Sequence, residues 1–359
     1  MDKINQTLDR WENRHPTMLS CRLIIQMFAG GISQFMTTIQ GMPKDVEDRM
    51  QKLINSFIWG ENKAAVSLKQ TRQPFGRGGF KLLDIHARNE AIDIMWLKNY
   101  LILDQSHPLW AFVADILIEE NIAKSSNIDR NVTCNTYLQK WSPSMAPGSK
   151  LPLDLKRMLK VGWKYNTGFS VINIPHQVKK LLPAWYHPGA ETNPRGFNRQ
   201  WTTQCLKENH QVRTIGDLVR LTNRLHSADP ADIHQDLQEC PCTPCTADRK
   251  LNCQNPNKCC HSAQDLIDHL KEKWNPLRNS NNADNLMLTH RRKKKNSEVK
   301  TNKTEILFDP SVKGEDNLEA YFRIFTDPAA TCQDPGLRPV QHANIIGAKT
   351  VVYVEGAHR

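Results

Sequence analysis

The chain has 359 residues, enough for two or three domains with buried cores, and its 39% hydrophobic content with nine Trp excludes wholesale disorder. Its formal net charge is +11, and residues 271–304 supply +7 of that charge, with ten Lys or Arg against three Asp or Glu. Because such a segment attracts polyanions, we expect RNA or DNA as the partner, bound without sequence preference. A membrane surface and a solvated linker are the alternatives.

The start of the chain has no apolar core of the signal-peptide kind, and the longest apolar run, 23–32, is interrupted by Gln26. We therefore expect neither secretion nor a membrane span. An intracellular chain, in the nucleus or the cytoplasm, would keep its ten Cys reduced or bound to metal.

Apolar residues at helical spacing predict a mainly α fold of helical bundle modules. Thr17 and Asp84 are the expected N-caps of two of these helices, and Gly30 and Gly31 are expected to loosen the first of the two. The expected helices cover residues 1–14, 17–39, 44–58, 85–103, 151–164, 174–182, 200–208, 214–225 and 263–270, and the segment 108–122 is expected to cover Trp96 and its neighbours.

Shifts in composition divide the chain into six expected segments. They are a helical module over 1–122, a polar linker over 123–150, a second helical region over 151–239, a Cys-rich segment over 240–277, a disordered basic linker over 278–304 and a C-terminal segment with short strands over 305–359.

Six Cys lie within residues 240–260, and a Cys-x2-Cys turn there presents two thiolates to one ion. A second pair would complete four soft ligands and leave no position for water, so we expect a structural zinc ion and no catalytic one. The expected ligands are Cys242, Cys245, Cys253 and Cys259, with Cys240, Cys260 and His261 as alternatives. Reduced thiols, several buried beneath the helix over 263–270, are the competing interpretation.

A run of cations after this segment is the expected nucleic-acid-binding sequence, and its residues are Arg291, Arg292, Lys293, Lys294 and Lys295. The same run could serve as a nuclear-import sequence or as a solvated linker. The glycine-rich loop over 76–79 could cradle a phosphate, although a plain turn is favoured because no Lys-Ser/Thr follows it. Known nucleophile, zinc-protease, nucleotide-binding and kinase motifs are absent from the sequence.

Short motifs in a fixed order resemble the region after the reverse transcriptase in non-LTR (LINE-type) retrotransposon polyproteins. They include Leu8-Asp9-Arg10-Trp11, His15-Pro16-Thr17-Met18, Gly41-Met42-Pro43-Lys44, Phe57-Ile58-Trp59, Gly78-Gly79-Phe80, Ala87-Arg88-Asn89-Glu90-Ala91, Pro108-Leu109-Trp110-Ala111, the Cys-rich segment, Lys273-Trp274-Asn275-Pro276 and Phe322-Arg323-Ile324-Phe325-Thr326. The resemblance implies that residues 1–122 correspond to the thumb and post-thumb helices of the polymerase, which hold template and primer without supplying the catalytic carboxylates.

In that family an RNase H domain follows and opens on a strand with Thr-Asp-Gly-Ser, whose Asp is the first of four carboxylates that hold two metal ions. The matching residues here are Val354-Glu355-Gly356-Ala357, so Glu355 stands at the position of that Asp. The other three acidic residues are not encoded, and one carboxylate does not hold two Mg²⁺ ions. The resemblance therefore implies a truncated RNase H-like segment.

Three hypotheses follow from the sequence. The first is a non-catalytic fragment or remnant of a retrotransposon polyprotein that binds nucleic acid. The second is a truncated part of an enzyme that copies RNA or cleaves RNA–DNA hybrids, and the third is a zinc-stabilised interaction module.

Overall fold

The computed structural model describes most of the first 278 residues, and the chain divides into two compact units. The described residues are 1–60, 64–103, 106–123, 128–165, 167–169, 174–190, 200–226 and 233–278, with 294, 301, 322 and 323. Among the described residues, unit 1 comprises those of 1–101 and 152–165, and unit 2 comprises those of 102–151 and 167–323. The first boundary therefore lies near residue 101, before the expected one at 122, because the helix over 109–120 groups with the second unit.

The described part of the chain is mainly helical, which confirms the expected fold class. The elements of unit 1 are α1 (Asp2–Glu12), α2 (Met18–Ile24), the π-helix η1 (Ile25–Gly30), α3 (Gly31–Gln40), α4 (Lys44–Trp59), α5 (Leu68–Thr71), η2 (Phe75–Arg77), α6 (Ile85–Tyr100) and α8 (Leu153–Lys164). Both expected N-caps are confirmed, since Thr17 accepts a hydrogen bond from the Ser20 amide and Asp84 accepts one from the Ala87 amide. Among the helices that the structure describes, none combines the length and the apolar character needed to cross a bilayer.

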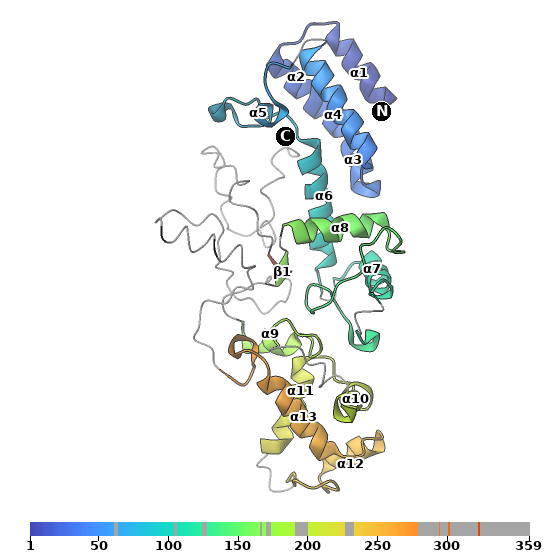
Figure 1. Cartoon of the computed structure of the whole chain (residues 1–359), viewed down its shortest axis with the longest axis vertical. Coiled ribbons are helices and arrows are strands. Elements are labelled where there is room, and N and C mark those ends of the chain that lie inside the picture. The colour runs from blue at the N-terminus through green and yellow to red at the C-terminus, as the bar shows by residue number, and fades with distance from the viewer. Residues whose placement is uncertain are drawn as a thin grey trace. The chain divides into compact units, whose positions relative to one another are not determined.

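Helices α1 to α4 lie side by side (Figure 1) and enclose the apolar core of unit 1. Its buried side chains are Ile4, Leu8, Cys21, Ile24, Ile25, Ala29, Met50, Ile54, Phe57, Leu82 and Ile85. Where two glycines were expected to loosen the second helix, the chain forms the π-helical turn η1, and the Arg88 guanidinium donates to the Gly30 carbonyl at 3.0 Å. The glycines therefore permit a local change of helix type within a continuous helical segment.

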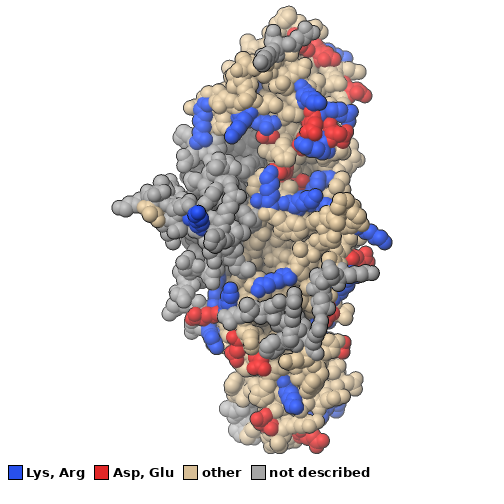
Figure 2. Space-filling model, in the orientation of Figure 1, with Lys and Arg blue, Asp and Glu red and all other residues tan. Residues whose placement is uncertain are grey.

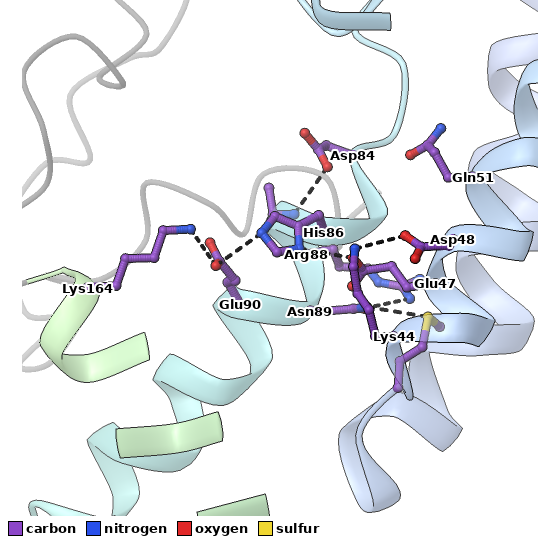
Figure 3. A network of polar contacts seen from close by, with 12 residues as sticks. Lys44, Glu47, Asp48, Gln51, Asp84, His86, Arg88, Asn89, Glu90 and Lys164 are labelled. Carbon is purple, nitrogen blue, oxygen red and sulfur yellow. Dashed lines mark hydrogen bonds and ion pairs between the residues drawn. The ribbon is translucent and has the colours of Figure 1, made fainter. Parts of the chain in front are cut away.

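A network of polar side chains connects α4, α6 and α8 (Figure 3). The nearly buried carboxylate of Glu47 accepts hydrogen bonds from Lys44 Nζ at 2.8 Å and from Asn89 Nδ2 at 2.9 Å. The two ring nitrogens of His86 lie 3.0 Å from Glu47 and 3.1 Å from Glu90. Each buried carboxylate thus has several partners, which is the condition under which such groups can be buried.

The elements of unit 2 are short helices joined by long irregular connections. They are α7 (Leu109–Glu120), η4 (Arg130–Val132), α9 (His176–Leu181), α10 (Trp201–Glu208), α11 (Ile215–Thr222), η6 (Asn223–His226), α12 (Thr243–Lys250), α13 (Pro256–Asp268) and η7 (Glu272–Trp274), with strands β1 (Gly168–Phe169) and β2 (Phe322–Arg323). The strands pair antiparallel, with Gly168 opposite Arg323. Helix α13 packs against α10, α11 and α12, so it lies at the centre of these helices.

The segment 123–150 was expected to be a polar linker, and its described residues instead pack into unit 2. Val132 and Leu138 belong to the buried core of the unit. Gln139 is also buried, and its Nε2 donates to the carbonyl oxygens of Val132 and Trp185, both at 2.9 Å. A segment rich in Ser, Asn and Pro can be ordered in this way because its few apolar side chains are anchored and its polar groups are paired.

We predict that Asp93 makes unit 1 less stable as the pH rises from about 4 to about 6. Burial raises the pKa of this α6 carboxyl to about 6, although Arg157 lies 3.7 Å away, from an ordinary value of about 4. In that interval the unfolded chain loses the proton while the folded chain keeps it, so stability falls by roughly 2 kcal/mol and the loss is complete above the raised pKa. Asp93→Asn should remove this dependence in urea-unfolding curves measured across pH.

The control is Asp45→Asn, because Asp45 pairs with Arg49 at 3.1 Å, its side chain is 71% exposed and it is not among the groups that shift the pKa of Asp93. That variant should keep the pH dependence of the natural chain. Equal pH profiles for Asp93→Asn and the natural chain would contradict the prediction.

Candidate metal centres

Two groups of four Cys and His side chains lie in unit 2, and each could hold a metal ion. In each group the four potential ligand atoms lie within 4.8 Å of one another. The core cluster consists of Cys205, His210, Cys253 and Cys259, and the loop cluster consists of His234, Cys240, Cys242 and Cys245.

The core cluster joins the end of α10 to the start of α13. Cys205 lies in α10 and His210 follows that helix, while Cys253 precedes α13 and Cys259 lies in its first turns. Asn209, the C-cap of α10, holds the two segments together, because its Nδ2 donates to Cys205 Sγ at 3.2 Å and to the Asn252 carbonyl at 3.1 Å. The cluster therefore connects parts of the chain more than forty residues apart.

The ligand atoms of the core cluster are close and poorly accessible. His210 Nε2 lies 3.2 Å from Cys253 Sγ, which lies 3.6 Å from Cys259 Sγ. Hydrogen bonds from Cys253 and Cys259 lower the pKa of the Cys205 thiol, whereas contacts with Cys205 and Cys253 raise the pKa of Cys259. The four potential ligand atoms lie within 4.8 Å of one another, and a cation bound among them would favour the deprotonated form of the thiols.

The loop cluster is built over twelve consecutive residues at the start of α12. Cys242 is the N-cap of α12 and Cys245 is its third residue, positions whose side chains lie together at a helix N-terminus. The helix N-terminus favours negative charge in general, whereas burial and the neighbouring Cys242 raise the pKa of the Cys245 thiol in the absence of an ion. The local fold thus explains why a Cys-x2-Cys spacing can present two sulfur atoms to one point.

His234 completes the loop cluster from the preceding segment. Its Nδ1 lies 3.5 Å from Cys240 Sγ, 3.6 Å from Cys242 Sγ and 3.3 Å from Cys245 Sγ. The Gln235 amide donates to Cys240 Sγ at 3.2 Å, and the Arg249 guanidinium donates to the Cys240 carbonyl at 2.7 Å. One imidazole nitrogen therefore faces three buried sulfur atoms, and the backbone around them is fixed by further hydrogen bonds.

Three sulfur atoms and one imidazole form a complete four-coordinate set. A set with all four positions supplied by protein leaves no open position for water or substrate, which distinguishes a structural centre from a catalytic one. Each cluster therefore has the composition of a site that stabilises the fold.

The structure does not bring the four sequence-predicted ligands to one point. Cys242 and Cys245 lie in the loop cluster, whereas Cys253 and Cys259 lie in the core cluster. Of the alternatives, Cys240 belongs to the loop cluster, Cys260 is fully buried and belongs to neither, and His261 is exposed, 3.4 Å from Asp236. The Cys-rich segment by itself indicated a single ion, because the residues that complete the two clusters lie outside that segment.

Three ligand candidates were missed, namely Cys205, His210 and His234. Each lies outside the segment 240–277 in which ligands were sought. The spacings Cys205-x4-His210 and His234-x5-Cys240 are the signals that could have pointed to them.

The other predicted site residues are almost all beyond the described part of the chain. Lys294 is described and exposed. Arg291, Arg292, Lys293, Lys295 and Glu355 lie outside the described residues.

Comparison of the chain with models of protein families, with curated proteins and with solved structures finds no match.

We predict that Cys259→Ser and Cys260→Ser differ in stability only while metal is bound. Both thiols are buried neighbours in α13, but only Cys259 is a candidate ligand. Losing one centre should lower the free energy of unfolding by about 3 kcal/mol when free metal exceeds the Kd a hundredfold.

Thermal unfolding of the reduced protein, with and without chelator, measures this difference. The two variants should converge once chelator has removed the metal. Equal melting temperatures of the two variants in the metal-loaded protein would contradict the ligand assignment.

Proposed function

We propose that this chain is a non-catalytic fragment or remnant of a non-LTR retrotransposon polyprotein that binds nucleic acid without sequence preference, with its second unit stabilised by zinc. The observation that carries the binding proposal is the concentration of positive charge, +7 over residues 271–304. The order of the short motifs that resemble the region after the polymerase supports the parentage.

A second positively charged surface, which we call the basic hairpin, lies in the described part of unit 1. It comprises residues 64–83, which contain Lys69, Arg77 and Lys81 together with Arg72, whose guanidinium pairs with Asp84 at 2.9 Å. Phe75 is about half exposed in it, and the Arg22 guanidinium lies over the ring, 5.7 Å from its centroid. Figure 2 shows Lys and Arg side chains over the α5 region. Cations beside an accessible aromatic ring suit phosphate contacts and base stacking on single strands.

The hairpin has a rigid turn, which preorganises these side chains. Gly78 has a φ of +72°, and a Cβ at Gly79 would lie 2.0 Å from the Gln73 carbonyl oxygen. The Phe80 amide donates to the Thr71 carbonyl at 2.9 Å. Glycine is therefore required for the geometry of the turn, in agreement with the plain turn favoured by the sequence.

Zinc is the proposed ion because each cluster offers three thiolates and one imidazole in a closed set. Soft sulfur ligands with one His are typical of structural zinc, whereas Mg²⁺ and Ca²⁺ require oxygen ligands. The donor sets thus support a zinc-stabilised interaction module as a second proposal, one that requires metal for folding and no nucleic acid.

The enzyme hypothesis predicts cleavage of an RNA–DNA hybrid by the purified chain with Mg²⁺, abolished by Glu355→Gln. We expect no cleavage, because a two-metal site requires several carboxylates at one place. Release of labelled RNA fragments that depends on Glu355 would replace our proposal by that hypothesis.

We predict that affinity for single-stranded RNA or DNA falls steeply with salt and that the basic hairpin contributes to the slope. Each neutralised phosphate releases counterions, so Arg77→Ala with Lys81→Ala should reduce the slope of log K against log salt concentration by about 2. Fluorescence anisotropy with oligonucleotides of unrelated sequence measures both quantities.

The matched control is Lys3→Ala with Lys160→Ala, which removes the same charge from exposed helical positions outside the hairpin. That control should leave the slope nearly unchanged. Absence of binding at low salt, or a slope that is flat in the natural chain, would reject the proposed function.

A further inference from the structure

The histidine of each cluster has a second ring nitrogen that faces away from the sulfur atoms. In the core cluster, His210 Nε2 faces the sulfur atoms and its Nδ1 lies 3.5 Å from Asp248 Oδ2. In the loop cluster, His234 Nδ1 faces the sulfur atoms and its Nε2 lies 3.1 Å from Asn257 Oδ1. A metal-ligating His is commonly oriented in this way, by an acceptor on its other nitrogen.

The two acceptors come from the opposite centres. Asp248 lies in α12, three residues after Cys245 of the loop cluster, and contacts the histidine of the core cluster. Asn257 lies in α13, two residues before Cys259 of the core cluster, and contacts the histidine of the loop cluster. Each helix therefore supplies a sulfur ligand to one cluster and an orienting side chain to the other.

Both acceptors are themselves fixed. The buried Asp248 carboxylate pairs with the Arg224 guanidinium, and the Asp248 carbonyl accepts a hydrogen bond from the Cys253 amide at 3.0 Å. The buried Asn257 donates through Nδ2 to Asp236, which sets its amide oxygen toward His234. Neither acceptor can turn away from its histidine without breaking a second contact.

We propose that the two centres bind zinc cooperatively, with Asp248 and Asn257 as reciprocal positioning residues. This inference rests on the zinc part of the proposed function. An ion in the loop cluster fixes α12 and so places Asp248 beside His210, while an ion in the core cluster fixes α13 and places Asn257 beside His234. The second ion then binds to a site already ordered by the first, which is positive coupling by shared ordering.

The test is a zinc titration of the reduced, metal-free full chain in competition with a chromophoric chelator. The natural chain should take up two equivalents with a Hill coefficient above 1. Cys245→Ser should bind one equivalent, and its core cluster should bind zinc about tenfold more weakly than in the natural chain, within the usual range of coupling. Cys260→Ser is the control and should retain two cooperative equivalents.

The positioning role is tested by rescue. Asp248→Ala should weaken the core cluster by about 10- to 100-fold, as removal of an outer partner of a ligand does. Asp248→Asn retains an acceptor oxygen and should recover most of that loss, whereas Asp248→Leu, which keeps comparable volume without an acceptor, should not. A side chain needed only for packing would be rescued by both variants, and one needed only for its charge by neither. Asn257→Ala should weaken the loop cluster to a similar extent, which keeps the inference testable if an Asp248 variant does not fold.

Two outcomes distinguish a failure of cooperative zinc binding from a failure of the zinc proposal itself. Two equivalents that bind independently, with unchanged core-cluster affinity in Cys245→Ser, would overturn the coupling and leave the zinc proposal intact. No zinc uptake by the reduced chain would overturn both.

Discussion

The packing of α13 against α10, α11 and α12 is the interaction on which the core cluster depends, and it also brings Asn257 to the histidine of the loop cluster. These are short helices, of 8 to 13 residues, and helices of that length are marginal in isolation. Only burial against neighbouring helices keeps the ends of these helices in position. Because Cys253 and Cys259 lie just before and in α13, whereas Cys205 and His210 lie in and just after α10, the four ligand atoms meet only when these two helices are packed. The packing and the clusters therefore reinforce each other.

Unit 1 is stabilised differently. Its core is made mostly of aliphatic side chains, and α6 is joined to α4 and α8 through buried carboxylates with several partners each. Arg157 illustrates the precision of this packing, since a Cβ at Gly41 would lie 1.7 Å from its guanidinium. Gly41 also has a φ of +68°, so both its backbone conformation and its surroundings exclude a side chain. The described part of this unit contains no Cys–His group of the kind seen in unit 2.

Local features of the fold could be predicted from the sequence, and non-local ones could not. The mainly α fold and the caps at Thr17 and Asp84 depend on neighbouring residues, so periodicity and side-chain type were sufficient. The helix α12 was not foreseen, because its eight residues contain two Thr, a Pro and a Cys. The ligand sets could not be predicted, for another reason. Cys253 and Cys259 share a cluster with Cys205 and His210, and spacing alone cannot reveal partners over forty positions away. The boundary near residue 101 and the ordered segment 123–150 are likewise decided by tertiary packing.

The order of the ligands along the chain has a consequence for how unit 2 folds. Residues 234–245, which hold the loop cluster, lie entirely within the stretch from Cys205 to Cys259 that the core cluster brings together. The two closures are nested. Closing the inner stretch costs less chain entropy than closing the outer one, by about 1 kcal/mol from their lengths. Once the inner stretch is closed, the outer loop is effectively shorter. The nesting therefore favours a folding order in which the start of α12 forms early and the meeting of α10 with α13 follows.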